Sequence, residues 1–256
     1  GNADAFLIKT PDNKYLMIDT AKSGYNGGKS QAKMLILKYL MDRGINNIDT
    51  IIVTHFDNDH CGGAVDLMEG VNVKNLYVNS LNHDSNAAKQ IYKTAEARGV
   101  ELILAENKRT CVLFIRDFLL IRNYISNEAG IGDNEASVLT LLRYKDFSML
   151  FTGDSGVDTF MKLKNYLPQN ITVLKVGHHG SNGVVNKEML EYLNPKYALI
   201  STGINKFGHP TIYTVAMLRD RTILRTDINN SIRFVVNDKG YNTFVFDTKK
   251  KKYIAK

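Results

Sequence analysis

The sequence has few cysteines, which stabilise small secreted proteins through disulfides, and few prolines, which interrupt helices and strands. Its 256 residues include two cysteines, Cys61 and Cys111, four prolines and no tryptophan. A chain of this length can bury a sizeable core without disulfides, so both cysteines are expected to be small core residues rather than a disulfide framework. No repeat, low-complexity block or linker interrupts residues 1–248, which predicts one domain.

Long apolar stretches are also absent. No run approaches the roughly 18 residues that a membrane-spanning helix needs, so the chain is expected to make no membrane contact. No signal peptide is recognisable, because Gly1 leads almost at once into the strand-like segment Ala5–Ile8. We expect a soluble protein whose compartment the sequence leaves open: cytoplasmic, or exported after removal of an N-terminal segment.

Basic residues outnumber acidic residues, 33 to 26, which gives a formal net charge of +7. Such an excess suggests a polyanionic partner. However, Lys249–Lys252 and Lys256 carry five of these charges and leave the rest of the chain at only about +2. We therefore predict a folded domain over residues 1–248 and a solvated basic tail over residues 249–256.

Strand-like runs and helical patterns both recur along the chain. Helical periodicity covers Ser30–Arg43, Ser85–Arg98 and Lys187–Leu193. Hairpins dominate the first strands and the middle of the chain, while strands and helices alternate elsewhere. This mixture predicts an α/β protein with mixed sheets and outer helices, rather than one doubly wound parallel sheet. The predicted strands are Ala5–Ile8, Tyr15–Ile18, Thr50–Val53, Val73–Val78, Val100–Leu104, Val112–Ile115, Leu119–Ile125, Ser137–Tyr144, Phe147–Phe151, Thr172–Val176, Tyr197–Ser201, Ser231–Val236 and Thr243–Phe246.

The placement of the six histidines is the most informative feature of the sequence. Five of the six lie just beyond the ends of predicted strands, near glycines and carboxylates, and only His83 lies in another polar loop, where we expect it to be solvent-exposed. The densest segment, residues 54–60, reads Thr-His-Phe-Asp-Asn-Asp-His. Three further polar segments follow later strands: Thr152-Gly153-Asp154, Gly177-His178-His179-Gly180 and Gly208-His209-Pro210.

Histidine and carboxylate side chains are the usual protein ligands of Zn, Mn and Fe. Four candidate ligands lie within six residues: His55, Asp57, Asp59 and His60. They are too closely spaced for all of them to bind one small ion, and without a cation they would repel or desolvate one another. The spacing suits two ions, with the first two residues facing one ion, the last two facing the other, and Asp154 between them. In such a pair a bridging hydroxide is the nucleophile, and the metals hold the attacking and leaving oxygens.

Each of the three later segments, taken alone, has a simpler interpretation. A Gly-Asp pair after a strand, as at Asp154, is usually a turn. His178 and His179, or His209 before Pro210, could equally be loop residues without a role. The combination of all four segments favours a metal site.

The string at residues 55–60, its Gly-Gly sequel and the order of the later segments resemble the metallo-β-lactamase superfamily. Within it, the pattern is similar to the hydrolase domain of the ComEC competence (DNA-uptake) family and its free-standing relatives. The common superfamily string has a second histidine where Asp57 stands here, and the aspartate is typical of the ComEC-like branch. The resemblance covers essentially residues 1–240, and its other matches are Asp4-Ala5-Phe6-Leu7-Ile8, Met17-Ile18-Asp19-Thr20 and Asp133-Asn134-Glu135-Ala136-Ser137-Val138-Leu139.

This resemblance implies a four-layer αββα sandwich with the metal site at one edge, between the two mixed sheets. Carried over by position, the first ion would be held by His55, Asp57 and His178, and the second by Asp59, His60 and His209, with Asp154 between. His179 would then be free to stabilise the oxyanion or to protonate the leaving group, so Asp59 and His179 are the expected catalytic residues. The choice between His178 and His179 as metal ligand stays open. Asn134, where much of the superfamily has a metal-binding histidine, is expected to support a ligand or to contact the substrate.

Asp57 makes the first site harder and more anionic, which favours Mn or Fe relative to Zn. We therefore predict a metal-dependent hydrolase with two divalent ions, Zn or Mn. The resemblance further implies a phosphodiesterase or nuclease that acts on a phosphodiester or nucleic-acid substrate through a metal-bound hydroxide. Lys175, Lys206 and Lys249–Lys252 are candidate contacts to backbone phosphates.

Two other functions stay open at this point. The same fold could hydrolyse a small ester, such as a phosphocholine ester or a lactone. Alternatively, the domain could bind nucleic acid without catalysis, although the complete set of metal-ligand candidates argues against this.

Overall fold

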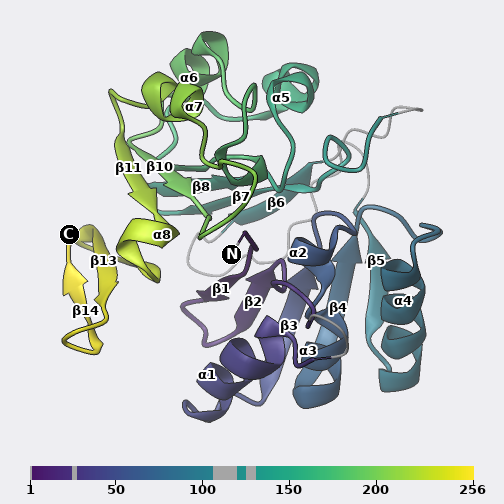
Figure 1. Ribbon diagram of the computed structural model, residues 1–256. Coiled ribbons are helices and arrows are strands. Elements are labelled where there is room, and N and C mark those ends of the chain that lie inside the picture. The colour runs from purple at the N-terminus through teal and green to yellow at the C-terminus, as the bar shows by residue number, and fades with distance from the viewer. Residues whose placement is uncertain (1, 25–27, 106–119, 125–130) are drawn as a thin grey trace.

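Two β-sheets stack face to face, and helices cover both outer surfaces (Figure 1). The structure is a computed structural model that describes residues 2–24, 28–105, 120–124 and 131–256. The prediction of a four-layer αββα sandwich with two mixed sheets is confirmed. Among the described helices, none combines the length and the apolar character needed to cross a membrane.

The first sheet has the strand order β1-β2-β3-β4-β5, with β1 antiparallel to β2 and the remaining neighbours parallel. Its strands are Phe6–Lys9 (β1), Tyr15–Ile18 (β2), Asn47–Ile52 (β3), Asn72–Val78 (β4) and Glu101–Leu104 (β5). The helices that follow these strands are Ala32–Ile36 (η2, a π-helical segment), Leu37–Met41 (α1), Asn58–Cys61 (α2), Ala64–Gly70 (α3) and Asn86–Arg98 (α4).

The second sheet has the order β11-β10-β9-β8-β7-β6, in which β6, β7 and β8 are antiparallel neighbours and β8 through β11 run parallel. Its strands are Leu120–Tyr124 (β6), Leu139–Tyr144 (β7), Phe147–Phe151 (β8), Val173–Lys175 (β9), Tyr197–Ile200 (β10) and Thr222–Arg225 (β11). Its helices are Val157–Leu163 (α5), Lys164–Tyr166 (η3), His178–Gly180 (η4), Lys187–Leu193 (α6), Ile212–Met217 (α7) and Thr226–Asn229 (α8).

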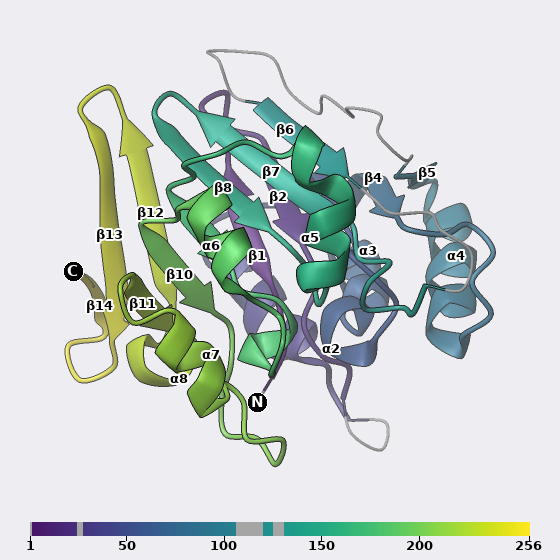
Figure 2. The ribbon, with the colours of Figure 1, turned by 90° about the horizontal axis from the view of Figure 1, so that it is seen from above.

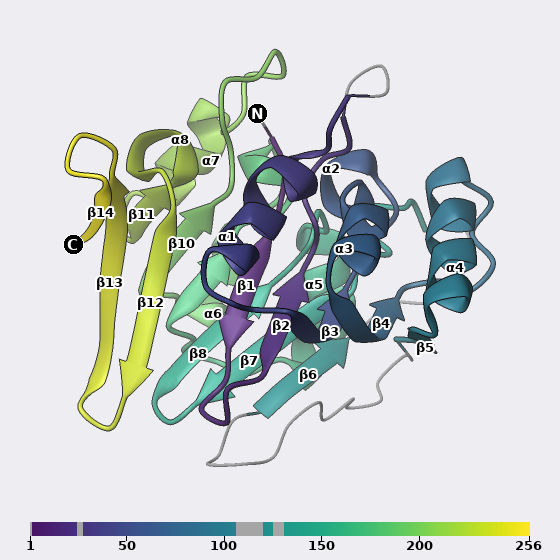
Figure 3. The same cartoon turned by 90° about the horizontal axis from the view of Figure 1, so that it is seen from below.

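A third, antiparallel sheet of Ile232–Asn237 (β12), Gly240–Asp247 (β13) and Lys252–Ala255 (β14) lies beside the sandwich (Figure 2 and Figure 3). Residues 249–256 were expected to form a separate tail, and this expectation is wrong for the half of the segment that forms β14. Lys252–Ala255 pairs in register with β13, and its Tyr253 and Ile254 are residue types that favour strands. The side chains of Lys249–Lys252 are exposed, as expected.

Buried apolar side chains fill the three spaces between the four layers. Ile51 and Val53 pack beneath the helices of the first sheet, whereas Ile52 packs between the two sheets. Successive side chains of a strand point to opposite faces. A strand buried on both faces is therefore apolar without alternation, which explains the run Ile51-Ile52-Val53.

The sandwich positions the polar segments because parallel strands end at a common edge. β2 and β3 are parallel neighbours in the first sheet, and β8, β9 and β10 are parallel neighbours in the second. The loops that follow these five strands therefore emerge at the carboxyl ends of both sheets. Figure 1 shows α2, which follows β3, at the gap between the two sheets.

Several predicted elements differ from the structure in extent. Ser30–Arg43 forms a helix only over residues 32–41, in a π-helical segment followed by an α-helix. The polar string after β3 was expected to be a loop, but Asn58–Cys61 forms the helix α2, with Asp57 at the N-cap position. β11 and β14 were not predicted from the sequence. The predicted strand Leu119–Ile125 corresponds to β6. Its end residues Leu119 and Ile125, the predicted strand Val112–Ile115 and Cys111 lie outside the described residues.

Candidate metal centre

The candidate ligands lie on loops and helix starts that follow the five parallel strands. His55, Asp57, Asp59 and His60 follow β3, and Asp154 follows β8. His178 and His179 follow β9, and His209 follows β10. The edges of the two sheets meet here, because His60 Nε2 lies 3.1 Å from Asp154 Oδ1 and His179 Nε2 lies 3.3 Å from Asp59 Oδ2.

Three buried histidines are each held at Nδ1 and face the centre with Nε2. His179 Nδ1 donates to the carbonyl oxygen of Ser201 at 2.8 Å, which fixes the proton on that nitrogen. His60 Nδ1 lies 2.7 Å from Asp19 Oδ2. His55 Nδ1 lies 3.0 Å from Thr54 Oγ1 and 3.3 Å from Ser137 Oγ. A second partner of this kind orients an imidazole whose other nitrogen binds a metal ion.

Asp19 is the residue that organises this arrangement. It follows β2 and is buried, with Oδ1 accepting from the backbone N–H of Thr54 at 2.8 Å and from the Thr54 hydroxyl at 3.0 Å. Its other oxygen holds His60. In the sequence, Asp19 was noted only as part of a segment that resembles the superfamily. Its position at the end of a buried strand, next to those of the metal-ligand candidates, was the signal for a supporting role.

The three candidate carboxylate ligands face these imidazole nitrogens. Asp57 Oδ2 lies 3.6 Å from His55 Nε2, with half of its side chain exposed. Asp154 is buried and lies within 4.0 Å of His60, His178 and His179. The backbone of Gly153 allows this approach, because a Cβ there would lie 2.7 Å from the Ser137 side chain and φ is +55°.

Several buried polar atoms of these residues have no hydrogen-bond partner, which fits a metal site. His55 Nε2, His60 Nε2, His209 Nδ1 and Asp154 Oδ1 are buried and make no hydrogen bond. Such atoms are costly unless a ligand or ion satisfies them. Two groups of donor atoms within 4.8 Å of one another share His60: His55–His60–Asp154 and Asp59–His60–His179. Two adjacent clusters of imidazole and carboxylate donors suit two divalent cations.

Two further groups of donors include a carboxylate beneath the site, Asp4. Asp4 is fully buried on the N-terminal segment, where its backbone N–H donates to the Asp59 carbonyl oxygen at 3.0 Å and its carbonyl oxygen accepts from Ala21. Its Oδ1 lies 3.6 Å from His179 Nδ1. Its principal partner is Lys175, whose Nζ lies 2.5 Å from Asp4 Oδ2.

Lys175 was expected to contact backbone phosphates, and the structure corrects this. The side chain is fully buried, its Nζ donates to the Gly153 carbonyl oxygen at 2.5 Å, and it lies 3.6 Å from Asp154 Oδ1. The last residue of a parallel strand points into the interior here, because the N-terminal segment covers it. Lys175 is thus a buried counter-charge to the carboxylates, and an incoming phosphate cannot reach it.

The charges of the site shift its pKa values in opposite directions. Burial by itself lowers the pKa of His60, but the Asp19 and Asp154 carboxylates outweigh burial and hold this pKa well above the usual value. Burial likewise lowers the pKa of His179, and Asp59 and Asp4 reverse that effect. Burial raises the pKa of Asp154, but His60 and Lys175 bring it well below its ordinary value.

These shifts have a direct consequence for cation binding. Because Nδ1 of His60 and His179 is already engaged, the additional proton on each ring is held at Nε2, the atom that faces the centre. A proton and a divalent cation compete for the same nitrogens. The electrostatics of the site therefore favour positive charge at this position.

The structure brings together some, but not all, of the predicted site residues. His55, His60, Asp154, Asp59 and His179 belong to the donor groups, and Asp57 lies beside His55. His178 and His209 belong to none of these groups. Their rings lie 5.6 Å apart, and the His178 side chain is 39% exposed and contacts Asn134 Nδ2 through Nδ1 at 3.3 Å.

This geometry differs from the expected division of roles between His178 and His179. His179 was expected to be free, yet its Nε2 lies within a donor group and its Nδ1 is fixed, as for a metal ligand. His178 is the more exposed of the two, with Nε2 4.0 Å from Asp154 Oδ2. Their adjacent positive φ values, +43° and +52°, turn the two rings in different directions. The geometry favours His179 as the ligand.

Two other residues near the site have structural explanations. Cys61 is a buried free cysteine whose thiol donates to the Phe56 carbonyl oxygen, and burial together with nearby carboxylates raises its pKa to about 12. This agrees with the prediction of a small core residue. His83 was expected to be exposed, but it is partly buried, with its ring centroid 4.9 Å from that of Phe56.

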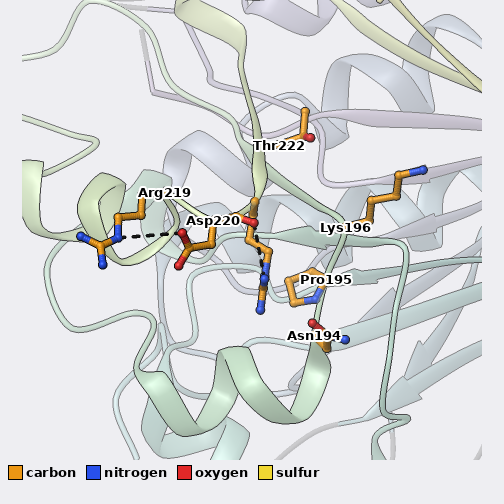
Figure 4. A pocket seen from close by; sticks show the side chains of 7 residues that line it. Asn194, Pro195, Lys196, Arg219, Asp220 and Thr222 are labelled. Atoms are coloured by element: carbon orange, nitrogen blue, oxygen red, sulfur yellow. Dashed lines mark hydrogen bonds and ion pairs between the residues drawn. The ribbon is translucent and has the colours of Figure 1, made fainter.

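A separate pocket lies at the opposite edge of the second sheet, where β10 and β11 begin (Figure 4). It is lined by charged side chains that include Lys196, Arg219, Asp220 and Arg221. Arg219 Nε lies 3.9 Å from Asp220 Oδ1, and Arg221 donates to the Leu190 carbonyl oxygen at 3.4 Å. It contains none of the candidate metal ligands.

A four-layer αββα sandwich with histidine and aspartate donors at one edge defines a class of metal-dependent hydrolases. A family model described as the metallo-beta-lactamase superfamily matches residues 1–204. The chain belongs to this superfamily, whose members typically bind divalent metals, and this assignment supports a hydrolase.

The chain is similar to curated proteins of bacterial competence. It is 32% identical over 250 residues to ComE operon protein 3 of Bacillus subtilis, which covers 91% of this chain and 32% of the relative. It is 26% identical over 239 residues to competence protein ComA of Neisseria gonorrhoeae, covering 91% of this chain and 31% of that relative. The chain thus spans about a third of the length of these relatives.

A solved structure supports the fold. The metallo-beta-lactamase fold protein YhfI from Bacillus subtilis superimposes with a TM-score of 0.58 over 88% of this chain and 89% of that chain. The two sequences are 13% identical, so this likeness shows the fold alone.

Proposed function

We propose that this chain is a divalent-metal-dependent phosphodiesterase that cleaves nucleic acid, with two ions bound at the edge of the sandwich. The observation that carries the proposal is the convergence of three buried histidines, each fixed at Nδ1 and directed at Nε2 toward acidic side chains. A hydrolytic site with this many directed donors needs no further residues to bind two cations.

We assign His55, Asp57 and Asp154 to one ion, and Asp59, His60, His179 and Asp154 to the other. When bound, such ions activate water and neutralise the charge that develops on a phosphoryl oxygen. The carboxylate-rich donor set favours Mn over Zn. It also favours a phosphodiester over a β-lactam, because harder, more anionic sites suit phosphoryl substrates.

His178 and His209 are assigned to the substrate. They stand beside the donor groups at the more exposed side, and His209 has a lowered pKa because of burial and the neighbouring His178. A neutral imidazole there can donate an N–H hydrogen bond to a non-bridging oxygen or to the leaving oxygen. In this role they replace the free His179 of the sequence-based prediction.

Nucleic acid is the proposed substrate because one of the curated proteins that this chain resembles is named a competence protein, and competence is the uptake of DNA. A short phosphodiester, such as bis-p-nitrophenyl phosphate, should be cleaved by the same chemistry. Cleavage of that ester without cleavage of DNA would instead favour the small-ester hydrolase considered from the sequence.

The test is divalent-dependent cleavage of bis-p-nitrophenyl phosphate and a labelled single-stranded oligonucleotide by EDTA-treated protein supplied with Mn²⁺ or Zn²⁺. Asp59→Asn preserves shape and should lower both activities by more than about 100-fold, since even outer partners of metal ligands cost about 10–100-fold. Asp220→Asn, at the opposite edge, is the matched control and should cleave normally. No turnover with any divalent ion would refute the proposal.

A further inference from the structure

The loop between β10 and α7 presents large apolar side chains to solvent beside the candidate metal centre. Ile204 is fully exposed and Phe207 is 64% exposed, although both are large hydrophobic residues. The loop runs directly into His209. Exposed apolar groups next to a polar site usually mark a binding surface.

The loop is held in one shape by the side chain of Asn205. Its Oδ1 accepts from the backbone N–H groups of Phe207 and His209, at 3.0 and 3.1 Å. Its Nδ2 donates to the carbonyl oxygens of Gly203 and His209, at 2.8 and 2.7 Å. A single amide thus ties both arms of the loop together, so the position of Phe207 is set before any substrate binds. Such preorganisation lowers the entropic cost of binding.

The Phe207 ring lies near both a cation and a histidine beside the candidate centre. It stacks on the His209 imidazole, with ring centroids 5.9 Å apart and an interplanar angle of 29°. Lys206 Nζ lies 5.7 Å from the Phe207 ring centroid. The His209 ring centroid also lies 5.6 Å from that of His178, whose Nε2 lies 4.0 Å from Asp154 Oδ2. A cation, an aromatic ring and a histidine beside the candidate centre therefore lie next to one another on this loop.

An unpaired nucleotide presents the matching chemistry. It carries a flat base and an adjacent phosphate, and proteins bind single strands by stacking bases on aromatic rings while cations neutralise the backbone. A base within a duplex is already stacked and paired, so an exposed loop ring cannot reach its face. The arrangement fits a single strand better than a duplex.

We propose that Phe207 is a specificity-determining residue that stacks on a base of a single-stranded nucleic acid and so positions the neighbouring phosphodiester at the candidate centre. This inference rests on the proposed phosphodiesterase function. It predicts that the protein distinguishes phosphodiesters that carry bases from those that do not.

The test uses two labelled single-stranded DNA oligonucleotides of equal length, one of deoxythymidine and one with tetrahydrofuran abasic sites in place of every base, both with Mn²⁺. Wild-type protein should cleave the thymidine strand with a kcat/KM roughly 5- to 150-fold higher, the range expected for stacking of one base. Phe207→Ala should lose this preference by slower cleavage of the thymidine strand alone. Phe207→Trp should retain it.

Met41→Ala is the matched control, because Met41 is 70% exposed at the end of α1, before the start of β3 and hence at the opposite edge. It should keep the preference. Equal cleavage of the two strands by wild type, or an equal loss on both strands in Phe207→Ala, would overturn the role of Phe207. Failure of wild type to cleave either strand would instead refute the proposed function itself.

Discussion

Replacing Lys175 with methionine tests whether a buried ion pair supports the candidate centre from below. Lys175 Nζ lies 2.5 Å from Asp4 Oδ2, and both side chains are shielded from solvent. Methionine has a similar length without the charge, so Lys175→Met leaves the buried Asp4 carboxylate without its principal ion-pair partner. Removing one partner of such a pair costs about 3–5 kcal/mol.

For a domain of this size each kcal/mol lowers Tm by about 2–4 °C, so Lys175→Met should lower Tm by roughly 6–20 °C. Thermal unfolding followed by circular dichroism in EDTA measures this without a contribution from bound ions. The double variant Asp4→Asn/Lys175→Met should recover part of the loss, because it removes both charges.

Lys187→Met is the matched control. Lys187 Nζ lies 3.6 Å from Glu191 Oε1, but the two side chains are 83% and 65% exposed, and solvent screens such a pair. Its Tm should change by less than about 2 °C. Equal Tm values for the Lys175→Met and Lys187→Met variants would refute the argument that the buried pair is structural.

Three further predictions concern the site and its surroundings. Asp19→Asn should weaken Mn²⁺ binding by about 10–100-fold in calorimetric titration, because it loosens the hold on His60, and unchanged affinity would contradict this. With EDTA present, the pKa of His60 in the folded protein is raised above its unfolded value, so the stabilisation by protonated His60 is complete below about pH 6.5 and is lost as pH rises through the folded pKa. Tm should therefore fall from pH 6 toward higher pH, and Mn²⁺ should counter the fall. A flat profile of Tm against pH would speak against the raised pKa. In a Cys111→Ser variant, Cys61 should resist thiol reagents at pH 8 until the protein unfolds, because burial raises its pKa to about 12, and rapid labelling of the folded protein would show otherwise.

The sequence was sufficient for the position of the site because the polar segments follow apolar strands. The runs ending near Val53, Phe151 and Val176 predict buried strands, and buried parallel strands end at one edge. The sequence alone therefore predicts that four of the candidate ligands lie together: His55, Asp59, His60 and Asp154. The structure brings their donor atoms within reach of one another.

The supporting residues could not be predicted in the same way. Lysine is usually a surface residue, and only the path of the N-terminal segment buries Lys175 against Asp4. The choice between His178 and His179 depends on two consecutive left-handed backbone conformations, which non-glycine residues adopt infrequently and no sequence periodicity reveals. Long-range packing, rather than local propensity, decides both.

The most direct test of the central claim is the number of ions that the working enzyme needs. EDTA-treated protein is titrated with Mn²⁺, and bound metal and cleavage of bis-p-nitrophenyl phosphate are measured at each step. A two-ion site predicts about two bound ions per chain, with cleavage rising as the second ion binds, and neither behaviour in Asp59→Asn. Full activity with a single bound ion, or no specific binding of divalent ions, would contradict it.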